Sequence, residues 1–535
     1  MSNQGVYKIP ERTNMSWWVC DRWVEEGRSD DIAIYQDDRK ITFAMLQEMQ
    51  NRFGNALKSL GINRGDKILF RLPNSAEYFS MILGSLKIGA IPCPTNTLFG
   101  TSELEHILNN SDAVLAVTNN EFQQALVESM KKNDTIKKLV LLDERQDEFL
   151  SYWDLVKDAS PDLEKLELKA DDPAFVFYTS GTTGPPKGIL HVHRWINVAG
   201  ENCNAWMDYK ASDIVLHPQE ISFSYPFGTA FVCPLFKGAS VVAFNERITP
   251  EKALESIDKY RVTIFCSVPT LYKMIMAIPE IEKNYDLKSL RHVICAGETL
   301  PAKIFHGWNS RIGCEILEAW GGSEPHAAIG NPPGSKIKPG SMGKPFHNLQ
   351  IAVLDDDGNP SPINKLGNLG IRDDMPNLHV EYLKNPDLWK STHKFGYFFI
   401  GDLAYKDEDG YYWYVSRSDD LIKSRGYLIS PKEVEDTIME HPAIANSGVI
   451  GAPDEVMGHK VKAFVILLEK HQPTEELALQ IRDHVKSRIA PFKAPKQIEF
   501  VKELPLTGTG KILRRELRRV EKERLERGET VGFDT

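Results

Sequence analysis

One segment of the chain has residue types that suit the binding of a polyphosphate. Residues 178–188 read Tyr-Thr-Ser-Gly-Thr-Thr-Gly-Pro-Pro-Lys-Gly. Glycines let backbone N–H groups turn toward an anion, while hydroxyls add donors and a lysine adds a mobile positive charge. The apolar run 174–177 precedes the segment, which predicts a buried strand that leads into a loop. A flexible surface loop is the alternative interpretation of such a cluster of Gly and Thr residues.

The segment differs from the common nucleotide P-loop, which ends Gly-Lys-Ser/Thr and places its lysine at the start of a helix. Here Lys187 follows two prolines and precedes Gly188, so no helix of that kind can begin there. The string instead resembles the phosphate loop of the adenylate-forming superfamily, which includes acyl-CoA synthetases, nonribosomal-peptide adenylation domains and beetle luciferases. The resemblance implies that the phosphates of ATP are bound by Thr179, Ser180, Gly181, Thr182, Thr183, Gly184 and Lys187.

A second motif, Ala-Trp-Gly-Gly-Ser-Glu at 319–324, follows a strand-like apolar run. It resembles the superfamily's Tyr-Gly-x-Thr-Glu segment, with Trp320 where tyrosine is usual and Ser323 where threonine is usual. The resemblance implies that Glu324 binds Mg2+, a hard cation that prefers carboxylate oxygen, and that Ser323 donates to the α-phosphate. A Gly-Gly turn beside a surface glutamate is the alternative. By the same resemblance, the nucleotide also contacts Ala296, Gly297, Glu298, Trp320 and Gly321.

Further matches to the superfamily lie between residues 399 and 426. The string Phe-Ile-Gly-Asp-Leu resembles Thr-Gly-Asp-Leu, so Asp402 is expected to accept hydrogen bonds from the ribose hydroxyls, although Ile400 replaces the usual threonine. Arg417 matches an arginine that also reaches the ribose. Asp419 falls at the superfamily's hinge, where a polar residue can absorb a large backbone rotation. Gly426 falls at the glycine that lines the path of the pantetheine of coenzyme A.

The last motif, Pro-Leu-Thr-Gly-Thr-Gly-Lys at 505–511, resembles the superfamily's Pro-x-Thr-x-x-Gly-Lys. The resemblance implies that Lys511 reaches across a domain boundary to the carboxylate and the α-phosphate. There it would screen their repulsion and stabilise the charge of the transition state. Ordinary surface charge is the alternative for a lysine in a Gly-rich loop. Lys511, Ser323 and Asp419 are therefore the expected catalytic residues.

The acyl pocket is expected beside the segment 219–228, whose Phe-x-Tyr-x-x-Gly spacing resembles aryl-CoA ligases that act on benzoate and its analogues. Short-acyl synthetases carry a tryptophan where Gly321 stands, so we expect an open pocket here. The expected lining residues are Phe223, Tyr225, Gly228, Pro269, Gly321, Gly322 and His326. A packed aromatic core is the alternative for Phe223, Tyr225 and Phe227. His326 lies one residue before the histidine of benzoate ligases, which is a departure from their pattern.

The elements that must position these motifs follow from hydrophobic periodicity. Apolar runs such as 67–70 and 138–142 alternate with helical patterns such as 77–87 through the first four hundred residues. This alternation predicts an α/β fold with largely parallel sheets. The charged stretch 511–525 predicts a solvated terminal helix, because glutamates interleave with its arginines.

The pattern changes near Arg417, where a short polar joint leads into a mixed region. A chain of 535 residues is too long for one compact core, so two or more domains are expected. We expect a large N-terminal region of layered sheets and helices, residues 1–418, that binds ATP and the acid. A small, mobile α+β domain, residues 419–535, is expected to carry the catalytic lysine.

The composition argues against several classes of function. A net charge of −10 argues against a nucleic-acid partner. The sequence contains no run of about 18 apolar residues, so no membrane span is expected. The seven cysteines are scattered and never paired as Cys-x-x-Cys, which indicates reduced core residues and a cytoplasmic location.

Together the motifs predict an ATP-dependent, AMP-forming acid–CoA ligase. Its partners would be coenzyme A, ATP and AMP, Mg2+ and a mid-sized aromatic or alicyclic acid such as benzoate or a cyclohexane- or cyclohexenecarboxylate. The alternatives are acyl transfer to a carrier protein, a medium-chain fatty acyl-CoA synthetase, a luciferase-like oxygenase and a non-catalytic ATP-binding sensor. No serine-centred helical pattern of a carrier domain occurs, which favours coenzyme A. Intact Lys511, Glu324 and Asp402 speak against a sensor.

Overall fold

The chain forms two compact units. The computed structural model describes residues 7–143, 146, 148–179, 185–246, 248–346, 349–376, 378, 381–425, 427–454, 457–506 and 511–535. The first unit contains the described residues up to 179, Pro185–Ile351 and Ile371–Phe398, and the second contains Ala352–Gly370 and Phe399–Thr535. The domain boundary expected after residue 418 stays a prediction. The compact units group the chain differently, because several strands that precede residue 418 belong to the second unit.

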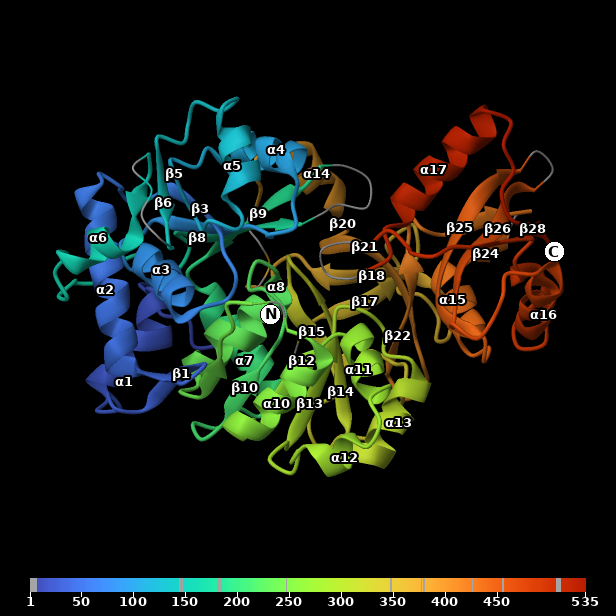
Figure 1. The fold of residues 1–535 in the computed structure, drawn as a ribbon, viewed down its shortest axis with the longest axis horizontal. Helices are drawn as coiled ribbons and strands as arrows, with labels where there is room; N and C mark the ends of the chain where they lie inside the picture. Colours follow the sequence, from blue (N-terminus) through green and yellow to red (C-terminus); the bar gives the residue numbers. More distant parts are fainter. Residues whose placement is uncertain are drawn as a thin grey trace. The chain divides into compact units, whose positions relative to one another are not determined.

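The largest sheet of the first unit has nine strands (Figure 1). In spatial order they are β16 (Lys344–Pro345), β15 (His326–Gly330), β14 (Ile316–Gly322), β13 (His292–Ala296), β12 (Ile264–Ser267), β10 (Ile214–Leu216), β11 (Ser240–Val242), β1 (Ile32–Gln36) and β2 (Arg39–Thr42). Strands β1 and β10 to β14 pair in parallel. Strands β12 and β13 are almost fully buried, which is typical of a parallel sheet that is covered on both faces.

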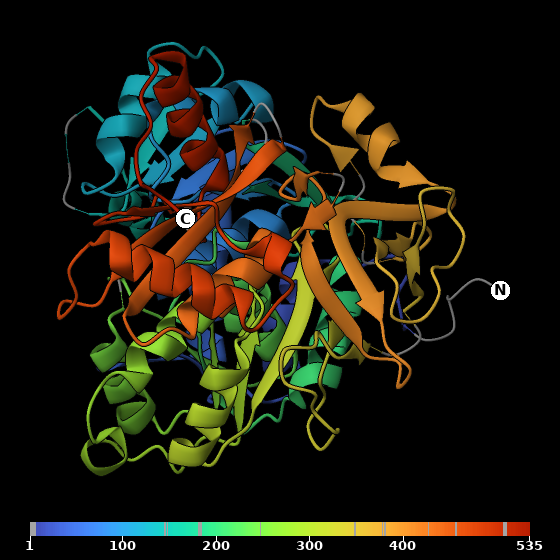
Figure 2. The same ribbon diagram turned by 90° about the vertical axis from the view of Figure 1, so that its right-hand side faces the viewer.

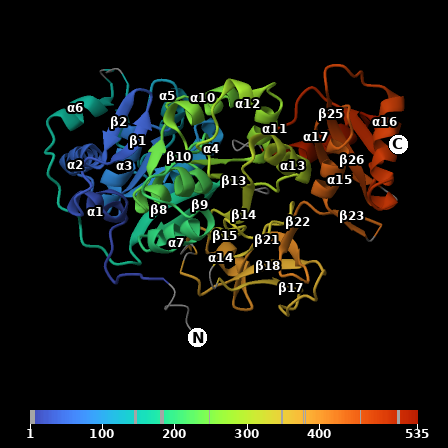
Figure 3. The ribbon, with the colours of Figure 1, turned by 90° about the horizontal axis from the view of Figure 1, so that it is seen from below.

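Helices on one face of this sheet build its core (Figure 3). The connections between its parallel strands contain α10 (Pro250–Tyr260), α11 (Pro269–Met276), α12 (Ile281–Asn284) and α13 (Ala302–Ile312). Leu254, Tyr272 and Trp308 of these helices pack in one buried cluster with Phe265 and Val293 of the sheet. The cluster packs these helices against the strands of the sheet.

A second parallel sheet has five strands, and a smaller sheet has three. The five-stranded order is β4 (Ile91–Pro94), β3 (Lys67–Arg71), β5 (Leu115–Thr118), β6 (Lys138–Leu141) and β7 (Leu150–Ser151), and the three-stranded order is β19 (Glu381–Tyr382), β9 (Lys187–Val192) and β8 (Pro173–Thr179). The apolar runs 67–70 and 138–142 are strands β3 and β6, as predicted. The helical pattern at 77–87 is α3 (Ala76–Lys87), which begins where Ser75 Oγ accepts the Tyr78 N–H.

The remaining helices of the first unit lie before, between and after these strands. They are η2 (Trp17–Asp21), α1 (Arg22–Glu25), α2 (Phe43–Ser59), α4 (Thr101–Ser111), α5 (Gln123–Met130), α6 (Tyr152–Lys157), α7 (Trp195–Met207), α8 (Ser224–Pro226), η3 (Phe227–Val232), α9 (Cys233–Phe236) and α14 (Pro386–Thr392), with the short strand β20 (His393–Lys394). The mixture of helices with largely parallel sheets confirms the predicted α/β class.

The second unit contains two sheets. One has β17 (Ile351–Leu354), β18 (Gly367–Arg372), β21 (Tyr397–Lys406) and β22 (Tyr412–Arg417). The other has β24 (Tyr427–Ile429), β23 (Ile422–Ser424), β26 (Gly458–Leu467), β27 (Gln497–Phe500) and β28 (Phe533–Asp534), with β25 (Ile444–Asp454) paired to β26. Its helices are α15 (Pro431–Met439), α16 (Glu475–Lys486), η4 (Pro491–Lys493) and α17 (Arg514–Glu526). The predicted C-terminal helix is thus confirmed as α17.

The helices of the second unit cover both faces of its larger sheet (Figure 2). Val449 of β25 packs in the cluster that α15 and α16 share, whereas the next residue, Ile450, packs with Leu517 of α17. Successive residues of a strand point to opposite faces. Helix α17 therefore lies on the face opposite α15 and α16.

Two sequence-based expectations about the whole chain can be compared with these elements. Within the part of the chain that the structure describes, no helix combines the length and the apolar character needed to cross a membrane. All seven cysteines belong to the described residues and are free thiols, and all except Cys314 are buried.

Candidate active site

The β8–β9 hairpin encloses the predicted phosphate loop. Thr179 and Lys187 lie directly opposite each other in its register, so the chain leaves the sheet and returns to the same place. His106 Nε2 donates to the carbonyl oxygen of Pro186 at 2.9 Å and holds the returning segment. The predicted strand before the loop is confirmed as β8. The predicted phosphate contacts Ser180, Gly181, Thr182, Thr183 and Gly184 lie outside the described residues.

Several predicted site residues lie at or just beyond the carboxyl ends of β12, β13 and β14. Ligands of α/β sheets bind at this edge. Ala296, the last residue of β13, is paired with Ala319 of β14. Gly297 then turns the chain with φ of +90°, and Glu298 follows. Pro269 starts α11 two residues beyond β12. The predicted adenine contacts and the second motif therefore start side by side.

The turn between β14 and β15 carries Ser323. Gly322 and His326 face each other across this hairpin, so the turn has three residues. Ser323 is held from two sides: His191 Nε2 donates to its carbonyl oxygen at 2.8 Å, and Ser224 Oγ lies 3.2 Å from its Oγ. Burial lowers the pKa of His191 to about 3, so the ring is neutral and donates from Nε2. Ser323 is thus held at its backbone by β9 and at its hydroxyl by α8.

Glu324 follows in the same turn, and a tyrosine holds its carboxylate. Tyr382 Oη donates to Glu324 Oε1 at 2.9 Å, and Glu324 is only 9% exposed. Tyr382 belongs to β19, which pairs with the strand that begins at Lys187. Mg2+ is usually held by one or two carboxylates together with phosphate oxygens and waters. An oriented, buried carboxylate fits that pattern, and among the described residues no cluster of three or more His, Cys, Asp or Glu could hold a metal ion.

Tyr225 lies between two aromatic side chains near the same strand ends. The Trp206 ring stacks on it with 6.3 Å between centroids, and the His217 ring meets it edge-on at 4.5 Å. The Tyr225 hydroxyl donates toward the backbone oxygens of Ser267 and Ile294, at 3.3 and 3.4 Å. Burial raises the pKa of Tyr225 well above its usual range, so the phenol stays protonated.

The other aromatic residues of segment 219–228 differ in their surroundings. Phe227 is fully buried and packs against Phe175 and Phe177, with 5.0 and 5.1 Å between ring centroids. The alternative of a packed core is therefore correct for Phe227. Phe223 is only partly buried and stays a predicted pocket residue.

Two glycines of the predicted pocket make room for His326. A Cβ added at Gly228 would meet His326 Nε2 at 1.9 Å, and a Cβ added at Gly321 would meet the His326 carbonyl oxygen at 2.0 Å. The His326 ring also packs edge-on against Trp195, and its Nδ1 lies 3.7 Å from Cys203 Sγ. The Cβ direction of Gly321 therefore points at the backbone of the hairpin, and the open pocket expected at this position stays a prediction. A side chain at that position would require the β14–β15 hairpin to shift.

In the second unit, Asp402 of β21 and Arg417 of β22 face each other across the sheet. Arg417 Nη1 donates to Asp402 Oδ1 at 3.1 Å. Gly401 precedes the aspartate with φ of +91°, and a Cβ there would lie 3.1 Å from Arg417 Nη2. The fold thus brings together the two residues predicted to contact the ribose.

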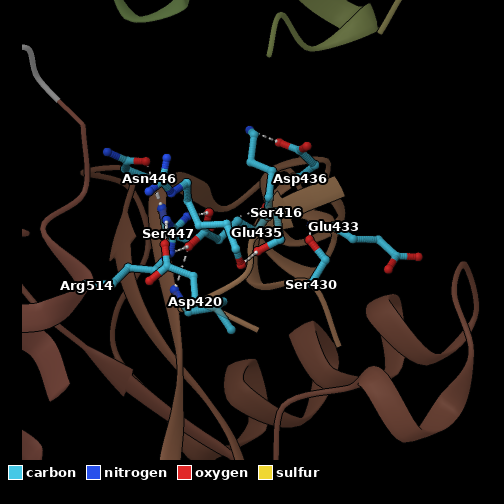
Figure 4. A network of polar contacts seen from close by, with 12 residues as sticks. Ser416, Asp420, Ser430, Glu433, Glu435, Asp436, Asn446, Ser447 and Arg514 are labelled. Carbon is cyan, nitrogen blue, oxygen red and sulfur yellow. Dashed lines mark hydrogen bonds and ion pairs between the residues drawn. The ribbon is translucent and has the colours of Figure 1, made fainter. Parts of the chain in front are cut away.

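The predicted hinge leads from β22 into a network of charged side chains (Figure 4). On one side of Asp419, the Ser418 N–H donates to a backbone oxygen of β21 at 2.9 Å. On the other side, the Asp420 carboxylate accepts from Arg514 Nη1 at 3.2 Å and from Arg518 Nη1 at 2.9 Å. Asp419 therefore lies between two residues that are anchored to different elements.

Lys511 ends a loop whose neck is closed by the backbone. Leu506 and Ile512 form an antiparallel bridge, which fixes the two ends of the segment between them. Lys511 itself is exposed, and α17 begins three residues later at Arg514. The segment 507–510 and the predicted CoA-path residue Gly426 lie outside the described residues.

Three residues that hold the site were not predicted from the sequence. They are His191 and Ser224, which contact Ser323, and Tyr382, which contacts Glu324. Each contact joins residues at least 58 positions apart. Local spacing carries no signal for such pairs. Ser224 lies within the segment 219–228 but carries no predicted role there, and His191 and Tyr382 stand outside every quoted motif.

Comparison with known proteins gives consistent matches over nearly the whole chain. A family model described as "AMP-binding enzyme" matches residues 20–380, and one described as "AMP-binding enzyme C-terminal domain" matches 433–511. The chain is 34% identical to the uncharacterized acyl–CoA ligase YtcI of Bacillus subtilis (strain 168), over 90% of each chain. It is 32% identical to the mitochondrial acyl-coenzyme A synthetase ACSM3 of Homo sapiens, over 96% of this chain and 90% of the relative. The solved structure of the anthranilate CoA ligase AuaEII in complex with anthranoyl-AMP superposes with a TM-score of 0.90 at 34% identity, over 97% of this chain and 99% of that one.

Proposed function

The chain belongs to the family of AMP-binding enzymes, and we propose that it joins a compact, ring-containing carboxylic acid to coenzyme A. It is an ATP-dependent, AMP-forming acyl-CoA ligase. The proposal about the acid rests on Tyr225, which stands between two aromatic side chains where the strands of the large sheet end.

The reaction uses ATP, Mg2+ and coenzyme A and has two halves. In the first half, a carboxylate oxygen bonds to the α-phosphorus of ATP, the bond to the β-phosphate breaks, and pyrophosphate leaves. In the second half, the thiol of coenzyme A loses its proton and attacks the acyl carbon, and the bond to AMP breaks. The protein contributes mainly by positioning the groups and by stabilising the charge that develops.

We assign the phosphates and the metal to residues of the first unit. Lys187, which stands opposite Thr179, supplies positive charge beside the phosphate loop. Glu324 would hold Mg2+, and the ion would supply positive charge to neutralise the phosphates. Ser323 donates its hydroxyl to the α-phosphate, and His191 keeps the backbone of that residue in place.

The ribose and the reacting carboxylate are assigned to residues of the second unit. Asp402 accepts hydrogen bonds from the ribose hydroxyls, and Arg417 both neutralises this carboxylate and donates to the ribose. Lys511 donates to the carboxylate and the α-phosphate and screens their repulsion in the first half. Asp419 is the pivot at which the backbone rotates between the two halves of the reaction.

Two observations support a ring acid as the substrate. Aromatic rings prefer offset-stacked or edge-to-face neighbours, and Tyr225 already packs with Trp206 and His217 in both ways, so we place a flat acid beside this cluster. The similar anthranilate CoA ligase, at 34% identity, acts on an acid that carries an aromatic ring.

A panel of acids tests the proposal. AMP formation is measured with ATP, Mg2+ and coenzyme A for acetate, octanoate, palmitate, benzoate, anthranilate and cyclohexanecarboxylate. Each methylene in a fitted pocket changes discrimination by about 1–3 kcal/mol, so the best ring acid should exceed acetate in kcat/KM by about a hundredfold or more. A highest kcat/KM for acetate, octanoate or palmitate would sink the ring-acid proposal while leaving the ligase chemistry intact.

The location of the protein in the cell is a further part of the proposal. A cytoplasmic location is proposed because seven free cysteines are typical of a reducing compartment. Imaging of a tagged chain in its own cells tests the location, and an organellar signal would contradict it.

A further inference from the structure

Two arginines of α17 belong to the charged network that follows the predicted hinge. We propose that Arg514 and Arg518 clamp Asp420 and thereby act as positioning residues for Lys511. The proposal rests on the proposed function, because it takes Lys511 to act in adenylate formation.

The clamp holds both oxygens of one buried carboxylate. Arg514 Nη1 donates to Asp420 Oδ2 at 3.2 Å, and Arg518 Nη1 donates to Asp420 Oδ1 at 2.9 Å. The Asp420 side chain is only 5% exposed, so water and salt screen these contacts less than they screen surface pairs. The two arginines stand one helical turn apart, which lets them approach the same carboxylate from one face of α17.

Arg514 also ties the clamp to the body of the domain. Its Nη2 and Nε donate to the two oxygens of Glu435 on α15, at 2.6 and 3.1 Å (Figure 4). Glu435 Oε1 in turn accepts the Val449 N–H of β25 at 2.8 Å, and Ser447 Oγ donates to the Glu435 carbonyl oxygen. Such two-point arginine–carboxylate pairs fix geometry as well as adding energy. The network therefore joins α15, β25 and α17 to the first residue after the pivot.

The consequence concerns how rotation at the pivot is transmitted. Ser418 is bonded to β21 and Asp420 is bonded to α17, so only Asp419 lies between the two anchored ends. Lys511 stands three residues before Arg514, on a loop whose neck is closed by a backbone bridge. A rotation at Asp419 must then carry Lys511 along as one rigid body. Without the clamp, the segment after Asp420 would absorb part of the rotation, and the ammonium group would lose its fixed place.

The same helix offers a matched control for general stabilisation. Arg524 also pairs with a buried carboxylate, since its Nη1 donates to both oxygens of Glu499, at 3.0 and 2.9 Å. Its exposed fraction is close to that of Arg514, at 24% against 18%. It stands ten residues further along α17 and has no contact with Asp420 among the bonds of the described residues. A loss that comes only from a weakened helix should therefore appear equally in Arg524→Gln.

The decisive experiment combines Arg514→Gln with Lys511→Ala in a double-mutant cycle. Adenylate formation is followed by ATP–pyrophosphate exchange, and thioester formation is followed from a supplied acyl-adenylate. In the wild-type background, Arg514→Gln should slow adenylate formation by about tenfold to a hundredfold, as misplacement of a catalytic group does, while Arg524→Gln stays near wild type. In the Lys511→Ala background, Arg514→Gln should cause no further loss, because residues that act as a unit are not additive.

Equal losses from Arg514→Gln in both backgrounds would overturn the clamp, since the arginine would then act independently of Lys511. A wild-type enzyme that forms no adenylate with any acid would instead refute the proposed function. If Arg514→Gln does not fold, Arg518→Gln takes its place, because it leaves the Arg514–Glu435 pair intact. Arg518→Gln should slow adenylate formation by a smaller factor than Arg514→Gln. In the Lys511→Ala background it should cause no further loss. A rate for Arg518→Gln that equals that of Arg524→Gln would also contradict the clamp.

Discussion

The carboxylate of Glu324 depends on a phenol that lies 58 positions away in the sequence. Tyr382 Oη donates to one of its oxygens at 2.9 Å and so orients the group. Partners that orient a metal ligand matter nearly as much as the ligand, since they fix both its direction and its basicity. The proposed metal ligand and its support can therefore be tested separately.

Tyr382→Phe removes this hydrogen bond while keeping the ring. We expect the Mg2+ concentration for half-maximal pyrophosphate release to rise by about tenfold to a hundredfold, as for other partners of metal ligands. Tyr260→Phe is the matched control, because its hydroxyl donates to the Asp37 carbonyl oxygen at an exposed position. A Tyr382→Phe enzyme with the Mg2+ dependence of the control would show that the phenol has no such role.

Lys511→Ala removes the proposed cation at the meeting of carboxylate and phosphate. Adenylate formation should fall by about a hundredfold to a thousandfold, in line with about 3 kcal/mol for a single transition-state donor. Thioester formation from a supplied acyl-adenylate should be spared, because Lys511 serves the first half only. The exposed Lys522 of α17 gives the control Lys522→Ala, and equal losses in both halves would contradict the role of Lys511.

Individual residues differ in how far the sequence revealed them. Asp402 and Arg417 were each matched to the ribose, and the fold does bring them into one ion pair. Gly321 was interpreted as open volume, but its Cβ direction points at the backbone oxygen of His326, which only the hairpin geometry shows. His191 was missed because its contact with Ser323 spans 132 positions.

The β14–β15 hairpin is the element that carries the second motif, and its close strands explain the glycine. Gly321→Ala should lower the free energy of unfolding by about 1–3 kcal/mol, because overpacking forces the backbone to shift. It should also slow pyrophosphate release, since Ser323 and Glu324 follow in the turn. Gly307→Ala on α13 is the control, because an added Cβ there makes only an ordinary contact with Met276. Similar urea midpoints for the two variants would contradict the close approach.

The joint between β22 and β23 is the element that must turn between the two halves of the reaction. Asp419→Pro fixes φ near about −65° and removes the rotation. The variant should still form adenylate but should fail to form the thioester, whereas Asp419→Ala should support both. Full overall turnover by Asp419→Pro would place the pivot elsewhere.

The regular elements were largely predictable because they follow local periodicity. The apolar runs became β3, β6 and β8, and the helical pattern at 77–87 became α3. The pairing of distant elements was not predictable in this way. The sequence gives no local sign that α17 binds α15 through Arg514 and Glu435, which are 79 positions apart.

The stability of the molecule should depend on pH through three buried histidines of the first unit. Burial lowers the pKa of His191 and His217 to about 3 and that of His193 to about 4. Their ordinary pKa is about 6.5, so the unfolded chain takes up protons first as the pH falls. The stability that comes from keeping these histidines neutral is fully present above about pH 6.5. Below that pH the free energy of unfolding falls, with a limiting slope of about 4 kcal/mol per pH unit for three groups.

Urea unfolding at pH 7.5, 6 and 5 measures this slope. Tryptophan fluorescence reports mainly on the first unit, since only Trp413 of the ten tryptophans belongs to the second. His193 accepts the Met15 N–H at Nδ1, so it must be unprotonated when folded. His193→Gln should reduce the slope by about 1.4 kcal/mol per pH unit, the contribution of one such group. A slope that is unchanged in this variant would show that His193 titrates normally.

The predicted α/β class of the whole molecule is confirmed, whereas its division into parts was only partly predictable. A change of pattern near Arg417 indicated a second, mixed region. The compact second unit also includes Ala352–Gly370, because β17 and β18 belong to the sheet of β21. Strand pairing between segments so far apart leaves no local signal.

Isotope transfer tests the central claim, an acyl-adenylate intermediate, most directly. The preferred ring acid, labelled with 18O in both carboxylate oxygens, is converted with ATP, Mg2+ and coenzyme A, and the products are analysed by mass spectrometry. The attacking oxygen stays with the phosphate when the thiol releases AMP, so the account predicts one 18O atom in each AMP and none in pyrophosphate. Unlabelled AMP, or labelled inorganic phosphate formed together with ADP, would contradict it.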